Sequence, residues 1–188
     1  MQDGADGGAG ENQVADLQGT EDQVTKDELL YRRVPRNTDK TRYYDRDGNR
    51  LRVLAQAFSE RPIPDGEPFA GQYRLSVDRA NLRGGNAELT RQGIPGRSPE
   101  TFGVVCMPAG EVRAIPSVAD IIPDPILNDP ELPDNPAHAL ICVAYDPTGS
   151  KTANRERHRE VIEELAAAAN RRPWAIDPPD DPPADAPE

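Results

Sequence analysis

The segment from Leu132 to Cys142 holds the side chains best suited to chemistry in this chain. It reads LPDNPAHALIC, so a proline-rich turn leads into an apolar strand that begins at His138. Imidazole readily exchanges a proton near neutral pH, and a nearby carboxylate can orient it as a general base. We therefore take His138 and Asp134 as candidate catalytic residues, with Asn135 of the same turn as a candidate binding residue.

The same segment also has a purely structural interpretation. Asp134 and Asn135 can close an Asx turn, with His138 half-buried and hydrogen-bonded to that turn. Alternation along the strand puts His138, Leu140 and Cys142 on one face. One histidine near an aspartate is a common pattern, and no nucleophile accompanies it. The structural interpretation is therefore favoured over catalysis.

A zinc site is a further possibility if the strands of Cys106, His138 and Cys142 are neighbours, because zinc binds thiolate and imidazole. The chain lacks the closely spaced ligand pairs typical of zinc sites, however. An isolated buried cysteine usually acts as a small hydrophobic residue. We predict no metal site, no cofactor and two reduced thiols.

Two adjacent arginines form a second group of candidate binding residues. Arg32 and Arg33 lie in an apolar strand next to Tyr31. Arginines beside aromatic residues can bind single-stranded nucleic acid or a phosphorylated cofactor. In the alternative, strand alternation puts one arginine in an internal salt bridge and the other in water.

A third candidate, Lys151, lies in the segment from Asp146 to Thr152, which follows an apolar strand and precedes a helix. A phosphate-binding loop occurs in this context. Counting back from Lys151, the positions that require glycine hold Ser150 and Tyr145, so the segment is not a P-loop. A turn with a Ser or Thr cap explains it better, and only weak anion binding is expected at Lys151.

Short apolar segments predict the elements that must position these residues. Each is bounded by Pro, Gly, Asn or Asp, which is typical of strands. The five predicted strands are Leu30–Val34, Leu51–Ala57, Tyr73–Val77, Phe102–Met107 and His138–Tyr145. The Asp-Gly-Asn sequence at 47–49 predicts a hairpin turn.

Helical spacing of apolar residues predicts one long helix from Thr152 to Ala169. Shorter helical turns are expected at 86–92 and 109–115. Dense prolines between 116 and 136 exclude a long helix or a central strand there and predict a surface connection. The fold class is therefore α+β, with a small, mostly antiparallel sheet and one C-terminal helix.

Charge and composition divide the chain into three parts. Residues 1–28 hold eight acidic residues and one lysine, and residues 177–188 hold five acidic residues and no basic one. Because the whole chain has a net charge of −11, the part between them is nearly neutral. Both ends are poor in large apolar residues, so we predict disordered acidic tails at 1–28 and 177–188. Residues 29–176 then form a single globular domain.

Three sequence segments resemble a group of small uncharacterised bacterial proteins. They are LYRRV at 30–34, LSVD at 75–78 and DNPAHAL at 134–140. The resemblance spans residues 29–145 and implies a compact domain within these limits. It implies no activity, cofactor or site.

The function expected from these observations is that of a non-enzymatic accessory or interaction domain in a bacterial cytoplasm, with a protein partner. No stretch approaches the ~18 apolar residues of a membrane span, and the start of the chain has no apolar signal segment. Two alternatives stay open. One is a small nucleotide- or nucleic-acid-modifying enzyme, such as a conflict-system effector, that uses His138 with Arg32 or Arg33. The other is nucleic-acid binding through residues 29–97, which hold fourteen basic and eight acidic side chains.

Overall fold

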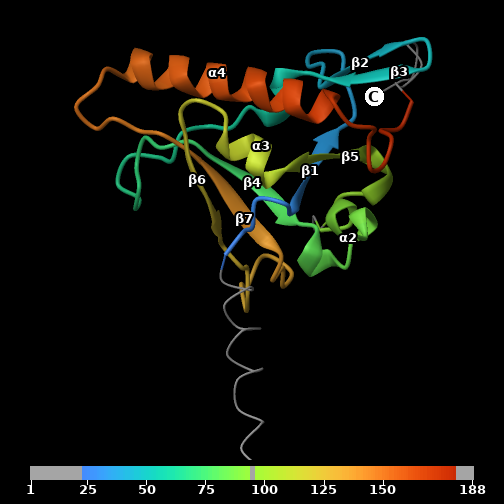
Figure 1. Ribbon diagram of the computed structural model, residues 1–188. Coiled ribbons are helices and arrows are strands. Elements are labelled where there is room, and N and C mark those ends of the chain that lie inside the picture. The colour runs from blue at the N-terminus through green and yellow to red at the C-terminus, as the bar shows by residue number, and fades with distance from the viewer. Residues whose placement is uncertain (1–22, 94–95, 181–188) are drawn as a thin grey trace, which may run out of the picture.

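A five-stranded antiparallel sheet organises the computed structural model, which describes residues 23–93 and 96–180 (Figure 1). In spatial order β5-β1-β4-β7-β6, its strands are Phe102–Pro108, Leu29–Pro35, Arg74–Arg79, His138–Val143 and Val118–Pro123. A separate hairpin consists of β2 (Tyr44–Asp47) and β3 (Arg50–Val53). The helices are α2 (Ala87–Arg91), α3 (Ala109–Arg113) and α4 (Lys151–Asn170), with 3-10 turns η1 (Ala55–Phe58), η2 (Asn81–Arg83) and η3 (Pro99–Thr101). This arrangement confirms the predicted α+β class with a mostly antiparallel sheet and a C-terminal helix.

Each predicted strand overlaps an observed strand, although the segment from residue 51 continues after β3 into η1. The hairpin turn forms as the sequence indicates, since Asp47 pairs with Arg50 and Gly48 has a φ of 56°. Glycine favours that left-handed conformation, which a tight hairpin requires at this position. Two strands were not among the five predicted: β2, for which only the following hairpin turn was predicted, and β6 in the proline-rich connection. For β6 the reason lies in its position in the sheet. It is an edge strand, where one side of the backbone forms no ladder and prolines are tolerated.

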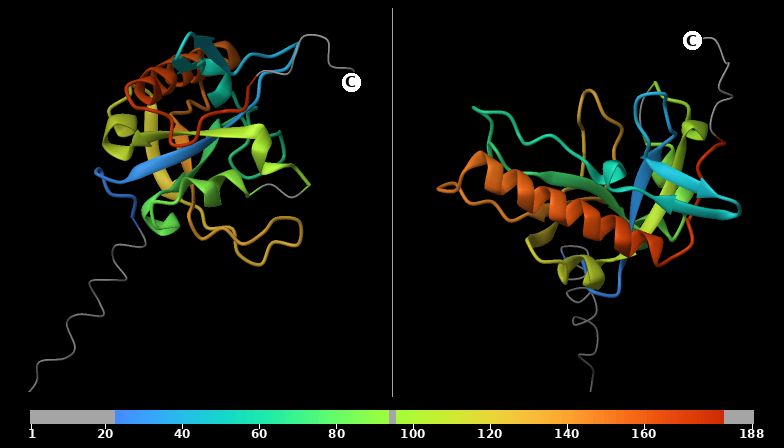
Figure 2. Two further views of the ribbon diagram at one scale, coloured as in Figure 1. Left: turned by 90° about the vertical axis from the view of Figure 1, so that its right-hand side faces the viewer. Right: turned by 90° about the horizontal axis from the view of Figure 1, so that it is seen from above.

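Helix α4 covers one face of the sheet (Figures 1 and 2). Its side chains Val161, Leu165 and Ala168 are fully buried in one cluster with Leu75 of β4 and Ile141 of β7. Burial of each large aliphatic side chain contributes about 2 kcal/mol, so this face holds most of the core. Along the described part of the chain, no helix is both long enough and apolar enough to cross a bilayer.

The opposite face of the sheet is only partly covered. Helix α2 and the loop of residues 124–137 lie on this side, apart from each other (Figure 2). Alternation exposes one set of side chains to this face. In the register, His138 of β7 is directly opposite Asp78 of β4, and Leu140 is opposite Ser76. The strand face between α2 and the loop therefore carries the polar residues Ser76, Asp78 and His138 together with the aliphatic Leu140.

Contacts of the folded part extend slightly beyond the predicted limits of 29 and 176. Glu28 is buried and pairs with Arg79 at 3.1 Å. At the other end, the Tyr44 hydroxyl donates to the carbonyl of Pro179, and Asp180 pairs with Arg46 at 3.3 Å. The rest of the two predicted tails, residues 1–22 and 181–188, lies outside the described residues.

Buried His158 makes the stability of the domain depend on pH. Its ring stacks on Tyr73 at 3.9 Å between centroids, and its Nε2 has no hydrogen-bond partner within the described ranges. Burial lowers the pKa of His158 from its usual value near 6.5, against a smaller opposing effect of Glu60. Below pH 6.5 the unfolded chain therefore binds a proton more readily than the folded domain does.

We expect the free energy of unfolding to decrease as the pH falls through 6.5 and to level off once the folded pKa is passed. The His158→Phe variant keeps an aromatic ring against Tyr73 but cannot titrate, so its pH dependence should be flatter. Urea denaturation at several pH values measures this. If the free energy of unfolding depended equally on pH in the wild type and in His158→Phe, His158 would not be the cause of the pH dependence.

Candidate functional site

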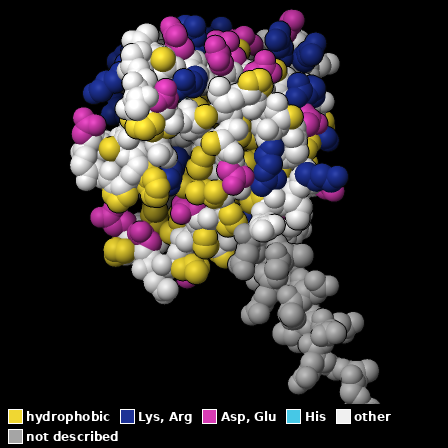
Figure 3. All heavy atoms as spheres, turned by 60° about the vertical axis from the view of Figure 1, so that its left-hand side comes forward, with side chains coloured by type: hydrophobic (Ala, Val, Ile, Leu, Met, Phe, Trp, Pro, Cys, Tyr) yellow, Lys and Arg dark blue, Asp and Glu magenta, His cyan; other side chains and the backbone are white. Residues whose placement is uncertain are grey.

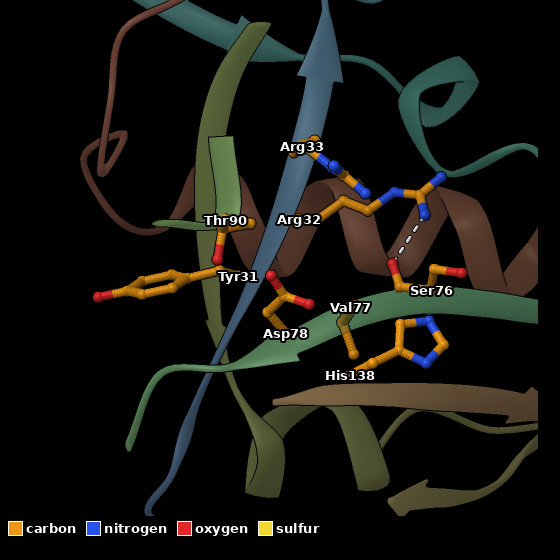
Figure 4. Close-up of a pocket in the computed structure, with 8 residues that line it drawn as sticks. All are labelled: Tyr31, Arg32, Arg33, Ser76, Val77, Asp78, Thr90 and His138. Carbon is orange, nitrogen blue, oxygen red and sulfur yellow. Dashed lines mark hydrogen bonds between the residues drawn. The ribbon is translucent and has the colours of Figure 1, made fainter. Parts of the chain in front are cut away.

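The candidate site is a cleft that opens where β1 and β4 separate. These strands pair only at Leu30–Arg79 and Tyr31–Asp78, whereas β1 pairs with β5 along its whole length. A small hollow lies at the separation (Figure 4). Its lining residues come from β1, β4, α2 and β7: Tyr31, Arg32, Arg33, Ser76, Val77, Asp78, Thr90 and His138.

Arg32 has a structural role at this separation. Its Nη1 donates a hydrogen bond to the backbone carbonyl of Ser76 at 2.7 Å, so the side chain bridges β1 and β4 where the backbone ladder has ended. Its Nη2 pairs with Glu60 at 2.7 Å. The charge and hydrogen-bond donors of Arg32 are therefore used within the domain.

Arg33 is different, because alternation directs it to the opposite face of the sheet. Its Nη1 is buried and has no hydrogen-bond partner in the described structure. The guanidinium lies beside Gly93, where a Cβ atom would be only 3.2 Å from Nη1. Burial lowers the pKa of Arg33; the charge of Asp78 partly opposes this shift, and Arg32 adds to it. A buried guanidinium nitrogen without an acceptor is costly and requires an explanation.

Thr90 of α2 supplies a second unused donor to the same cleft. Thr90 is only 2 % exposed, and its Oγ1 has no hydrogen-bond partner in the described structure. Leaving such a group unsatisfied costs about 1–3 kcal/mol. Two buried atoms that lack hydrogen-bond partners, Nη1 of Arg33 and Oγ1 of Thr90, thus belong to residues that line one cavity.

The carboxylate that lines this cleft, Asp78, is already engaged. One of its oxygens accepts hydrogen bonds from Arg83, at 3.1 Å to Nη2, and the other accepts from the Asn135 side chain at 2.8 Å. Asn135 in this way holds the loop of residues 124–137 to β4. With Arg32 paired to Glu60 and Asp78 paired to Arg83, the charge of Arg33 is the one left unmatched among the lining residues.

His138 presents a hydrogen-bond acceptor to the cleft. Its Nδ1 lies 2.7 Å from the backbone carbonyl of Asp124 and 3.1 Å from the Asp124 carboxylate. Both are acceptors, so Nδ1 carries the hydrogen and Nε2 of the neutral ring keeps a lone pair. The aspartate beside the imidazole is therefore Asp124. Asp134 instead accepts from the backbone N–H of Asn128 at 2.8 Å and closes the loop.

The structure brings together four of the six residues singled out from the sequence. Arg32, Arg33 and His138 line the cleft, and Asn135 holds its rim. Asp134 faces the loop, and Lys151 lies at the start of α4. Lys151 lines a separate cavity of about 780 Å³ together with Arg155, Tyr73 and Tyr145. Sequence reasoning missed Thr90, Asp78 and Asp124. Asp78 shares a strand face with Arg74 and Ser76 by alternation along β4, which is the one signal in the sequence that could have indicated it.

The cysteines do not join this site. Cys106 lies on β5 and Cys142 on β7, and two strands separate these in the sheet. Burial raises the pKa of both thiols. Within residues 23–93 and 96–180, no group of three His, Cys, Asp or Glu side chains is arranged to hold a metal ion.

The nucleic-acid hypothesis requires five arginines on one exposed face: Arg36, Arg42, Arg46, Arg50 and Arg52. In the β2–β3 hairpin, Arg52 is directly opposite Asp45, and Arg46 points to the other side. Arg42 also pairs with Asp45, at 3.1 Å. The arginines are divided between two faces and lie among acidic residues.

The surface seen from the β6 side shows hydrophobic side chains gathered across its middle and lower parts, with basic side chains mainly at the upper and right margins (Figure 3).

No family model, curated protein or solved structure matches the chain. The likeness to small bacterial proteins, inferred from short segments, stays a prediction.

Proposed function

We propose that this chain is a non-enzymatic binding domain that recognises a carboxylate group of a partner in the cleft between β1 and β4. The observation that carries the proposal is the pair of buried, unpartnered donors, Arg33 and Thr90, in one cavity. A carboxylate supplies two acceptor oxygens and a negative charge, which match a guanidinium and a hydroxyl.

Charge balance favours a monoanion over a phosphate dianion. Arg33 contributes one unmatched positive charge to the cleft, because the charges of Arg32 and Asp78 are paired elsewhere. A carboxylate neutralises this charge, whereas a dianion leaves an excess negative charge next to Asp78. An uncompensated charge in a partly buried site is unfavourable.

The arrangement supports binding better than catalysis. Ser76 lines the cleft with His138, but the Ser76 hydroxyl donates no hydrogen bond to the imidazole. An activated nucleophile requires such a contact with its base. The domain thus has a means of holding an anion and lacks a paired nucleophile among the described residues of the cleft.

Titration with acetate tests the proposal. We expect saturable, millimolar binding that shifts the amide NMR signals of Arg33, Thr90 and their neighbours, with inorganic phosphate binding more weakly. Thr90→Val should weaken acetate binding at least about tenfold, because a hydrogen bond to an ionised carboxylate contributes about 1.5–3 kcal/mol. Arg52→Met, which removes an exposed arginine from β3, is the matched control and should change nothing. Acetate shifts that are unsaturable and unaffected by Thr90→Val would refute the proposal.

A second candidate function is a small enzyme that modifies a nucleotide. Its support is the orientation of His138, whose Nδ1 donates to Asp124 so that Nε2 can act as a base. Product formed from a nucleoside triphosphate by the wild type, and absent with His138→Gln, would favour this function over carboxylate binding.

A further inference from the structure

The carboxylate cleft continues into an apolar hollow. This second hollow shares Arg33, Ser76 and His138 with the first. Its remaining wall includes the apolar side chains of Ile126 and Leu132 from the loop of residues 124–137. One end of the combined cleft is thus cationic and the other aliphatic.

The loop that forms the aliphatic wall is held in a defined conformation. The backbones of Ile126 and Asn135 exchange two hydrogen bonds, of 3.0 and 2.7 Å. The Asp129 carboxylate accepts from the backbone N–H of Leu132 at 2.9 Å. Leu132 is nevertheless 46 % exposed, so a firmly held loop presents a large apolar side chain to solvent. Preorganised apolar surface beside polar anchoring groups is typical of ligand sites.

Three features of the cleft therefore specify what a ligand should contain. Arg33 and Thr90 need an anionic acceptor. The lone pair on Nε2 of His138 needs an N–H or O–H donor, since Nδ1 is committed to Asp124. Leu132, with the apolar wall around it, offers an aliphatic surface.

We infer that the cleft binds the C-terminal residue of a partner polypeptide that ends in an aliphatic amino acid. In such a residue a carboxylate, an amide N–H and an aliphatic side chain are all attached to one Cα atom. The carboxylate binds Arg33 and Thr90, the amide N–H donates to His138, and the side chain packs against Leu132. This inference rests on the proposed carboxylate function. It narrows the source of the carboxylate to a polypeptide C-terminus, since a free aliphatic acid has no amide N–H.

Short peptides test the inference on the full chain. The probes are acetyl-Ala-Ala-Leu with a free carboxylate, the same peptide as its C-terminal amide, acetyl-Ala-Ala-Ser with a free carboxylate, and hexanoate. The leucine acid should bind most tightly. Amidation should weaken binding at least about tenfold, because charge-assisted hydrogen bonds are lost. The serine peptide should bind about tenfold more weakly, because the aliphatic side chain no longer leaves water.

Variants separate the two ends of the cleft. Leu132→Ser should remove the preference for the leucine acid over the serine acid, and urea denaturation of the variant checks that this half-exposed position leaves the fold intact. Leu82→Ser, at a partly exposed leucine of η2, is the matched control. Equal affinities for the leucine and serine acids, or for hexanoate and the leucine acid, would overturn the inference while acetate binding still supported the proposed function. Absence of binding by acetate and all peptides would overturn both.

Discussion

Replacing Arg33 by methionine is expected to remove carboxylate binding and to stabilise the unliganded domain. Acetate affinity should fall about 100-fold, which is the loss of charge-assisted hydrogen bonds from a guanidinium. The free energy of unfolding should rise by about 1 kcal/mol, because methionine fills similar space without a buried, unpartnered Nη1. Opposite changes in binding and stability are typical of a residue kept for function.

Urea denaturation and acetate titration of the same Arg33→Met sample measure both effects. Arg52→Met removes the same charge from an exposed site on β3 and should leave acetate binding unchanged. Arg33→Lys keeps the charge but not the planar donors, so acetate affinity should be intermediate. A large loss of stability in Arg33→Met would mean that Arg33 holds the fold together, and it would contradict the proposed role in binding.

Glu28→Ala should destabilise the domain by about 3–5 kcal/mol, the usual cost of removing one partner of a buried ion pair. The Glu28 carboxylate accepts two hydrogen bonds from Arg79, of 3.1 and 3.2 Å, and both side chains are almost fully buried. Without Glu28 the buried Arg79 loses the two hydrogen bonds to this carboxylate, while its donation to the Gln23 carbonyl remains. Small domains have unfolding free energies of about 5–15 kcal/mol, so this loss should be visible as a much lower urea midpoint.

Glu88→Ala is the control for this second prediction. Glu88 pairs with Arg91 at 3.2 Å on the surface of α2, and its side chain is 39 % exposed. Exposed pairs contribute little, so the change should be below about 1 kcal/mol. If Glu28→Ala and Glu88→Ala lowered stability equally, the buried pair between the segment before β1 and strand β4 would not be a major stabilising contact.

Most of the elements could be predicted from the sequence, because their signals are local. Short apolar segments bounded by turn residues predicted β1, β4, β5 and β7, and apolar residues at helical spacing predicted α4. The turn at Gly48 followed from a short glycine-containing segment. Strand β6 was missed, since the prolines around it resemble those of a loop and only its edge position in the sheet makes them acceptable.

Tertiary structure alone decided which charged groups have partners. Arg32 and Arg33 are neighbours in the sequence, yet Arg32 pairs with Glu60, a residue far along the chain, while Nη1 of Arg33 lacks an acceptor. The carboxylate next to His138 in space is Asp124, fourteen positions away, and the nearer Asp134 is used by its own loop. Side-chain periodicity indicates a face of a strand, but it contains no information about the neighbouring strand. The cleft exists because β1 lies between β5 and β4 and separates from β4 after two residue pairs, and that order results from the packing of the whole sheet.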